Sequence, residues 1–209
     1  MKSLRVLATL CVLTLAVASS APADAAFANP EINVAKVGAM GSHCKNENVI
    51  WEFDKPTNLL RVVYTDFYSW TNEAQRETLA NCIIVYHMKI SKGWQIVGQY
   101  LSLYAETALP ETGRATVGME LRYPGADGST QVAGIGARRT EPGFGRLTPG
   151  QAQQMSGTPC DGQAVEVVME TTATTYFDAK PGEAHITISD LHADSRDPAS
   201  KVGLYARKC

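Results

Sequence analysis

The sequence predicts an all-β fold, an antiparallel β-sandwich of the jelly-roll or immunoglobulin-like kind with about eight or nine strands. Three observations predict it. Apolar and polar residues alternate with a period of two over most of the chain, which is the pattern of strands with one buried face. Clusters of Gly, Pro, Asp and Asn separate these stretches and mark turns. Strands do not alternate with helices, which favours antiparallel sheets packed face to face.

The first 25 residues have the order of a secretory signal peptide. Two of the first five residues are basic, an uncharged apolar run covers 6–18, and Ala23-Asp24-Ala25 forms a small-x-small cleavage site. The apolar run has about 13 residues, whereas a membrane-spanning helix needs about 20. We therefore expect residues 1–25 to be removed, which leaves one domain, 26–209, outside the cell or in the periplasm. An uncleaved anchor is the alternative.

The charge balance disfavours several classes of partner. The chain has 19 basic and 21 acidic residues and a formal net charge of −2. Because no basic stripe is visible, a nucleic acid is not an expected partner. Nothing indicates binding to a membrane surface, and no membrane span is expected in the mature chain. The expected partner is an extracellular ligand or a cell-surface component.

Four cysteines remain once the leader, which contains Cys11, is removed. They are spread over the whole chain, at Cys44, Cys82, Cys160 and Cys209. An even number in an exported chain indicates two disulfides, and the spacing is unlike that of a zinc site. Of three possible pairings we prefer Cys44–Cys82 with Cys160–Cys209, because the second bond would hold the last residue in place. Each would close a loop of about 40–50 residues and stabilise the fold by about 4 kcal/mol.

The expected strands follow from the alternation, in chain order. A short strand is expected at 49–53, and the stretches 59–67 and 94–104 carry apolar residues on both faces, which indicates central, more fully buried strands. Clean alternation predicts further strands at 82–90, 115–123, 165–170, 185–189 and 202–206. The one expected helix is a turn or two within 72–80, where the residues favour helix.

Residues 125–157 depart from this pattern. The span is rich in Gly and contains two prolines and a group of three arginines, Arg138, Arg139 and Arg146. It is too long for an ordinary connection, so it is interpreted as a functional or mobile loop that contains a weak strand at 131–137. The arginines are interpreted as part of a solvated loop rather than an anion site.

Several motifs between residue 41 and the end occur in the order seen in a known family. They are the strand Leu60–Phe67, Asn81-Cys82 before an alternating strand, Pro159-Cys160-Asp161-Gly162, and the ending Arg207-Lys208-Cys209. In these motifs the chain resembles the small secreted four-cysteine microbial family catalogued as a domain of unknown function. It departs from that family at Tyr205-Ala206, where the family tends to have Trp. The resemblance implies export, a β-sandwich and two disulfides, and it implies no activity.

No set of catalytic residues is recognisable. A Gly-x-Ser-x-Gly nucleophile motif is absent. His185, Ser189 and Asp190 are close in sequence, but on one strand His185 and Ser189 would lie about 13 Å apart. They are interpreted as polar residues of a strand face, and no catalytic residue is assigned.

A metal site is a weak possibility. Asp190, His192 and Asp194 cluster after the predicted strand, and carboxylates on a loop can hold calcium. The ligand spacing of an EF-hand is missing, and the segment is also typical of a plain turn. We therefore expect no cofactor, with calcium as the alternative.

Aromatic residues give the clearest indication of binding. Phe67, Tyr68 and Trp70 follow one another at a strand exit, and three aromatic side chains there cannot all enter one core. They are the candidate ligand-binding residues, with a sugar as one candidate ligand. The alternative is that Phe67 and Trp70 anchor the segment onto the sandwich.

Three functions are compatible with these features. The first is a non-enzymatic exported module that binds or coats a cell surface or another extracellular ligand, a glycan among them. The second is a secreted hydrolase whose site is scattered across strands. The third is a secreted effector or inhibitor that acts through residues 125–157.

Overall fold

The computed structural model describes residues 30–72, 74–177, 183–188 and 199–209. The predicted all-β fold is confirmed: these residues form strands joined by turns, with one short 3-10 turn, η1 (Asn46–Asn48). The strands are β1 (Ile32–Gly41), β2 (Val49–Asp54), β3 (Leu59–Tyr64), β4 (Tyr68–Thr71), β5 (Glu77–Ile90), β6 (Trp94–Ser102), β7 (Ala105–Leu109), β8 (Gly113–Pro124), β9 (Thr130–Arg139), β10 (Gly143–Leu147), β11 (Gly150–Gln154), β12 (Ala164–Phe177), β13 (Ala184–Ile188) and β14 (Ser200–Lys208).

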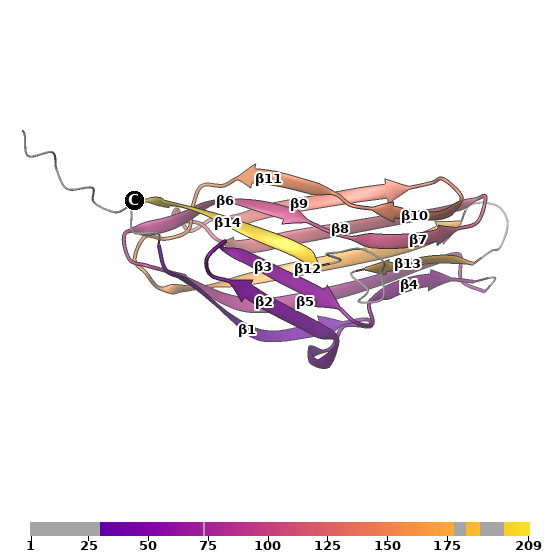
Figure 1. The fold of residues 1–209 in the computed structure, drawn as a ribbon, viewed down its shortest axis with the longest axis horizontal. Helices are drawn as coiled ribbons and strands as arrows, with labels where there is room; N and C mark the ends of the chain where they lie inside the picture. The colour runs from indigo at the N-terminus through magenta and orange to yellow at the C-terminus, as the bar shows by residue number, and fades with distance from the viewer. Residues whose placement is uncertain (1–29, 73, 178–182, 189–198) are drawn as a thin grey trace, which may run out of the picture.

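The strands form three antiparallel sheets in two layers (Figure 1). Sheet A, in the order β1-β5-β12-β8-β9, makes one layer with the longest strands. Sheet B, in the order β11-β6-β14-β3-β2, and sheet C, in the order β10-β7-β13-β4, lie side by side in the other layer. This arrangement is a β-sandwich in which one layer is divided into two sheets.

Four segments of the chain extend across the divided layer, each with one strand in sheet B and one in sheet C. The segments are β3 to β4, β6 to β7, β10 to β11 and β13 to β14, and their order across sheet B matches their order across sheet C. The ladders therefore stop at a common level, near residues 65–67, 103–104 and 148–149. At this level the amide of Leu103 donates to the carbonyl of Pro149 (3.0 Å), and that of Ile188 donates to Phe67 (3.0 Å).

The core lies between the two layers. Strands β5, β8 and β12 bury every second residue, which is the period-two pattern expected of strands with one dry face. Two buried hydroxyl pairs join β12 to the opposite layer: Tyr64 to Thr171 (2.7 Å) from sheet B, and Ser69 to Thr175 (2.9 Å) from sheet C. Sheets B and C therefore both turn their inner faces to sheet A and their outer faces to solvent.

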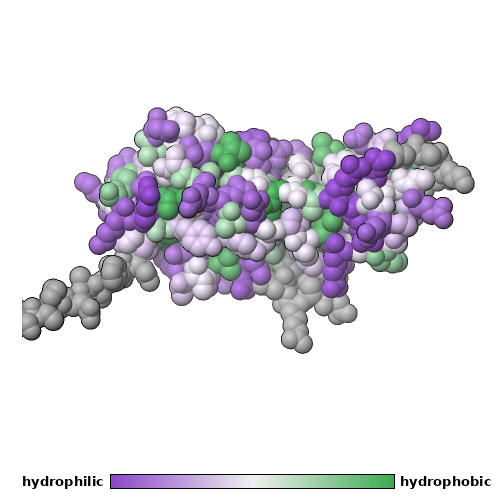
Figure 2. Space-filling model, turned by 90° about the horizontal axis from the view of Figure 1, so that it is seen from above, coloured by the Kyte–Doolittle hydropathy of each residue, from purple (hydrophilic) through white to green (hydrophobic). Residues whose placement is uncertain are grey.

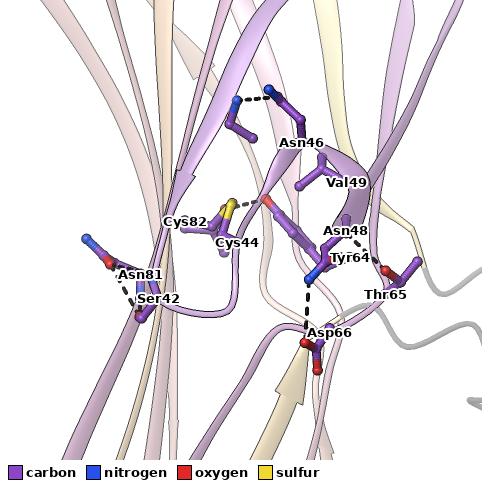
Figure 3. The surroundings of a disulfide bond; sticks show 12 residues. Ser42, Cys44, Asn46, Asn48, Val49, Tyr64, Thr65, Asp66, Asn81 and Cys82 are labelled. Carbon is purple, nitrogen blue, oxygen red and sulfur yellow. Dashed lines mark hydrogen bonds between the residues drawn. A yellow bond between two sulfur atoms is a disulfide. The ribbon is translucent and has the colours of Figure 1, made fainter.

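The predicted disulfide pairing is confirmed. Cys44 bonds to Cys82 on β5, and Cys160 bonds to Cys209 directly after β14. Beside the first bond, Ser42 accepts a hydrogen bond from the amide of Asn81 (2.9 Å), so the segment after β1 is held onto β5 (Figure 3). The second bond fastens the end of β14, where the amide of Cys209 also donates to the carbonyl of Gly93 (2.9 Å).

Each expected strand coincides with a strand of the structure, but the expected number of about eight or nine is too low. The described residues form 14 strands, and β1, β4 and β7 were not expected. Residues 59–67 and 94–104 contain β3 and β6, each of which has a neighbouring strand on both sides. Two other expectations are wrong. The helix expected within 72–80 is absent from the described residues, because Glu77 to Ala80 belong to β5 and pair with β12. Pairing along a long neighbouring strand overrides a weak local preference for helix.

The loop expected at 125–157 is the second error, because this span contains β9, β10 and β11. The weak strand expected at 131–137 lies within β9. In β9 the outward positions include Gly134 and Gly136, while Ala133, Ile135 and Ala137 pack against the core. The sequence marks this strand only weakly, because glycine occupies outward positions at which alternation would otherwise show polar side chains.

Some expectations fall outside the described residues. They are the signal peptide at 1–25 and the calcium candidates Asp190, His192 and Asp194. The described part of the chain contains no helix with the length and apolar character needed to cross a membrane.

Candidate functional site

The candidate site is the outer face of sheet C. Its strands are short, and β4, β7 and β13 bury alternate residues against sheet A, so the residues between them face solvent. The ladder registers place these outward residues in two rows that cross all four strands. One row is Trp70, His185, Ala108 and Phe144, and the other is Tyr68, Thr187, Glu106 and Arg146.

The first row carries two large aromatic side chains that are exposed to solvent. Trp70 on β4 is 42% exposed and Phe144 on β10 is 92% exposed. Three strand spacings separate them, about 14 Å. Between them lie His185 and the small Ala108. Single exposed aromatic residues are common on protein surfaces, so the informative feature is that these two lie in one row across the sheet.

In the second row Tyr68 lies between two histidines. Its ring centroid is 4.2 Å from that of His43 and 6.0 Å from that of His185. His43 belongs to the segment just before Cys44 and has a φ of 54°, which is unusual for a residue other than glycine. Backbone strain of this kind collects at functional sites, and here it accompanies an imidazole placed against the Tyr68 ring.

Charged and hydroxyl groups complete the second row. The carboxylate of Glu106 accepts hydrogen bonds from the hydroxyl of Tyr104 (2.6 Å) and from Nε of Arg146 (3.3 Å). The Arg146 guanidinium also lies 5.9 Å from the centre of the Tyr104 ring. On β13, Thr187 Oγ1 is 3.3 Å from Nε2 of His185. The row therefore offers oriented donors and acceptors next to the aromatic row.

A hollow of about 540 Å³ lies at the β10 side of this face. It is lined by Glu106, Thr107, Phe144, Gly145 and Arg146. Apolar and charged groups thus meet in one recess, as they do in sites for small ligands.

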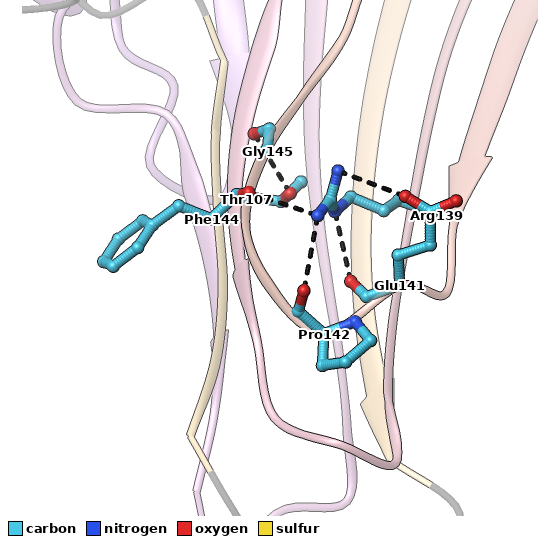
Figure 4. A network of polar contacts seen from close by, with 6 residues as sticks. All are labelled: Thr107, Arg139, Glu141, Pro142, Phe144 and Gly145. Carbon is cyan, nitrogen blue, oxygen red and sulfur yellow. Dashed lines mark hydrogen bonds and ion pairs between the residues drawn. The ribbon is translucent and has the colours of Figure 1, made fainter.

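Arg139, at the end of β9, holds the turn that leads to Phe144 (Figure 4). Its guanidinium donates to the carbonyls of Glu141 (3.2 Å), Pro142 (3.5 Å) and Phe144 (3.1 Å). The side chain passes so close to Gly145 that a Cβ there would collide with it. The turn before Phe144 is therefore fixed from inside by one largely buried cation.

The three aromatic residues singled out from the sequence have different positions. Tyr68 and Trp70 lie on the outer face of sheet C, where they point away from the core. Phe67 is only 1% exposed and packs against Tyr64, with ring centroids 5.2 Å apart, so it anchors the segment and is not available to a ligand. The three residues predicted to form one ligand-binding cluster are therefore a buried anchor, Phe67, and two surface residues, Tyr68 and Trp70.

Sequence reasoning missed His43, Glu106 and Phe144 as members of the site, and considered His185 and Arg146 for other roles. Only cross-strand registers bring these residues together, because they come from four distant segments. Phe144 was detectable as a large apolar residue between Gly143 and Gly145 in a polar span. Such a residue is typical of an exposed contact point when a short strand carries it.

The structure tests metal binding only for the residues that it describes. Within them no three His, Cys, Asp or Glu side chains are grouped so that they could hold an ion. Asp190, His192 and Asp194 lie outside the described ranges. Calcium at that cluster therefore stays a prediction.

No family model and no curated protein matches the chain. Among solved structures, TmCBM61 in complex with β-1,4-galactotriose is 8% identical, with a TM-score of 0.29, and the match covers 84% of this chain and 88% of that one. A family 11 carbohydrate-binding module from Clostridium thermocellum, in complex with a mixed-linked tetrasaccharide, is 13% identical over 84% of this chain and 88% of that one, with a TM-score of 0.19.

The enzymatically active domain of tailspike protein 4 from bacteriophage CBA120 is 13% identical, with a TM-score of 0.28. That match covers 84% of this chain but only 19% of the tailspike chain. All three TM-scores are below the level at which likeness carries an argument about function. Any function has to be inferred from the chain's own residues.

Proposed function

We propose that the chain is an exported, non-enzymatic module that binds a glycan on the outer face of sheet C. The observation that carries the proposal is the row in which Trp70 and Phe144, both exposed, lie at the two ends with His185 and Ala108 between them. Sugar rings have apolar C–H faces that stack on aromatic rings, and hydroxyls that need hydrogen-bonding partners. The aromatic row and the neighbouring row with Glu106, Arg146 and Thr187 supply these two kinds of contact side by side.

The environment of Glu106 supports binding rather than hydrolysis. Most glycoside hydrolases use two carboxyl groups that flank the bond to be cleaved. The hollow beside Phe144 has Glu106 as its carboxylate, and that group is already engaged by Tyr104 and Arg146. A fixed carboxylate with an arginine partner is suited to accepting hydrogen bonds from sugar hydroxyls.

The proposal is tested by a glycan array followed by titration of the best-bound glycan. Replacing both Trp70 and Phe144 by Ala should weaken binding at least about tenfold, which corresponds to about 1.4 kcal/mol. Such a loss agrees with the role of exposed aromatic anchors in recognition. Phe144 is almost fully exposed and Trp70 is partly exposed, so the double variant should keep its fold, which thermal unfolding checks.

Leu79→Ala is the matched control. Leu79 is 61% exposed on β5, in the other layer of the sandwich, so its loss should leave glycan affinity unchanged. The proposal is wrong if the wild-type protein binds nothing on the array, or if the Trp70 and Phe144 variant binds as tightly as the wild type.

A further inference from the structure

A second group of exposed aromatic residues lies on the outer face of sheet B. Tyr100 on β6 is 38% exposed, and Tyr205 on the neighbouring strand β14 is 53% exposed. Tyr100 is paired with Gly203 and Tyr205 with Gly98, so the two tyrosines are diagonal neighbours on one face. Diagonal neighbours of this kind are about 7–8 Å apart, within mutual reach of aromatic side chains.

Glycines on the adjacent strands leave room for both tyrosine rings to lie along the sheet. A Cβ at Gly98 would be 3.5 Å from the Tyr205 ring, and one at Gly150 would be 2.7 Å from the Tyr100 hydroxyl. Each ring therefore covers the backbone of a neighbouring strand and does not stand up from the sheet. A ring in this position turns one of its faces outward.

The strands are irregular at this point. The pairing of β14 with β6 shifts after Tyr205, because Tyr205 is opposite Gly98 while Ala206 is opposite Ile96. The residue skipped in this shift is Val97, which lines a hollow of about 280 Å³ together with Gly98, Ala152, Gln153, Gln154 and Tyr205. Bulges re-aim side chains and are common next to binding sites.

Amide groups border the tyrosines. Gln154 on the edge strand β11 is opposite Gly98, in the same row as Tyr205, and is exposed. Its side chain can donate and accept hydrogen bonds at the margin of the aromatic surface. Like the rows on sheet C, this surface combines aromatic rings with a neighbouring group that forms hydrogen bonds, here an amide.

We infer that Tyr100, Tyr205 and Gln154 form a second glycan subsite on the same side of the molecule as the first. The inference rests on the proposed function of sheet C. Both outer faces point away from sheet A, and the segment from β6 to β7 joins them directly. Tyr100 and Ala108 are eight residues apart on this segment, a span of at most about 27 Å. One long glycan chain can therefore contact both subsites, whereas a short one contacts only one.

The test is isothermal titration with trisaccharides and octasaccharides from three neutral series: cello-, xylo- and β-1,4-galacto-oligosaccharides. For the series that binds, the wild-type protein should take two trisaccharides per chain but one octasaccharide. The octasaccharide should bind about a hundredfold more tightly, because its second contact is intramolecular. The variant with Tyr100→Ala and Tyr205→Ala should take one trisaccharide and lose the gain with chain length.

Two further variants separate this inference from the proposed function. The Trp70 and Phe144 double alanine variant should also take one trisaccharide, bound at the tyrosines. Tyr100→Phe with Tyr205→Phe keeps both rings and should retain two sites, which controls for loss of fold. Chemical shifts of ¹³C-labelled tyrosines in the wild-type protein report the contact without any substitution.

Three outcomes decide between the two subsites. One trisaccharide per wild-type chain, with no change in the tyrosine-to-alanine variant and no shift of Tyr100 or Tyr205, overturns the second subsite and leaves the first intact. Binding that only the tyrosine substitutions abolish supports this subsite and overturns the one on sheet C. No binding of any of the three series overturns the second subsite, and a glycan array on which the wild-type protein binds nothing overturns both.

Discussion

At the scale of single residues, Arg139 connects the core to the candidate site. Its side chain is 16% exposed, and its guanidinium satisfies three carbonyl oxygens of the turn before Phe144. A buried cation with several hydrogen bonds contributes more than a surface ion pair, because removing it leaves polar groups without partners. The position of the exposed Phe144 therefore depends on a residue that belongs to neither row of sheet C.

Replacing Arg139 by Ala should loosen this turn. We expect a loss of about 1–3 kcal/mol in the free energy of unfolding, since the three carbonyls lose a charged donor. Glycan affinity should fall as well, because Phe144 is no longer held in place. Denaturant unfolding and titration of the glycan measure the two effects, with Arg138→Ala as the control. Unchanged affinity in a destabilised Arg139→Ala variant would show that the turn does not position Phe144.

At the scale of the strands, alternation made most of the fold predictable. Strands such as β8 and β12 have polar residues at most outward positions, so their period of two is visible. Strand β9 was expected only as a weak strand within a loop, and β10 and β11 were missed, because Gly134, Gly136, Gly143 and Gly150 interrupt the pattern and Gly is typical of loops. Glu77 to Ala80 were assigned to a helix from local preference, which carries no information about the partner strand β12.

The candidate site was less predictable than the fold. Tyr68 and Trp70 were found because three aromatic residues in a row cannot share one buried face. Phe144 and Glu106 were not, because a cross-strand register brings them next to each other and the sequence does not encode registers locally. Phe67 is buried whereas Tyr68 and Trp70 are on the surface. Their common position at a strand exit does not predict which of the three is buried.

Side chains also cover the open edge of sheet A at strand β9. The amide of Gln153 on β11 accepts from the backbone N–H of Gly134 (3.1 Å) and also donates to its carbonyl. Gln131 accepts in turn from the amide of Ser156 (3.3 Å). The N–H and C=O of Gly134 are thus occupied at this side of the molecule, where apolar residues form small separate patches (Figure 2). Open edges are sites at which sheets of different molecules join.

Gln153→Ala should therefore increase self-association. Without the amide, the N–H and C=O of Gly134 are left to pair with another chain. Size-exclusion chromatography with light scattering should show dimers or larger species at concentrations where the wild-type protein is monomeric. Gln151→Ala, an exposed position on the same strand, is the control and should behave like the wild type. A Gln153→Ala protein that stays monomeric would mean that the edge is protected in another way.

At the scale of the whole molecule, three buried tyrosines link stability to pH. Burial raises the pKa of Tyr123 from its ordinary value of 10.0 to about 12. Burial also raises the pKa of the Tyr64 and Tyr86 hydroxyls above that value. All three face the space between the two layers, so each loses its solvation when the sandwich closes.

The sign of the effect follows from the direction of these shifts. Below pH 10 the tyrosines are protonated in both the folded and the unfolded chain, and their contribution is fully present. Above pH 10 the unfolded chain releases protons that the folded chain retains, so stability falls as pH rises. Each tyrosine removes up to about 1.4 kcal/mol per pH unit, and for Tyr123 the window is pH 10 to about 12.

Denaturant unfolding at pH 9, 10, 11 and 12 checks this expectation. Stability should be nearly constant up to pH 10 and then decline steeply, with a smaller decline in Tyr123→Phe. Tyr205→Phe, at an exposed position, should follow the wild type. A flat profile to pH 12 would contradict the burial of these hydroxyls.

The common level at which the ladders of sheets B and C stop has a consequence for how the molecule can vary. Among the residues that the structure describes, no backbone ladder crosses that level within the second layer, and both disulfides lie outside the strands of sheet C. The aromatic rows thus lie on a sheet without a disulfide, whereas both disulfides join segments in or next to strands of sheets A and B. The outward residues of sheet C can therefore be substituted to change what this face binds, while both disulfides stay unchanged.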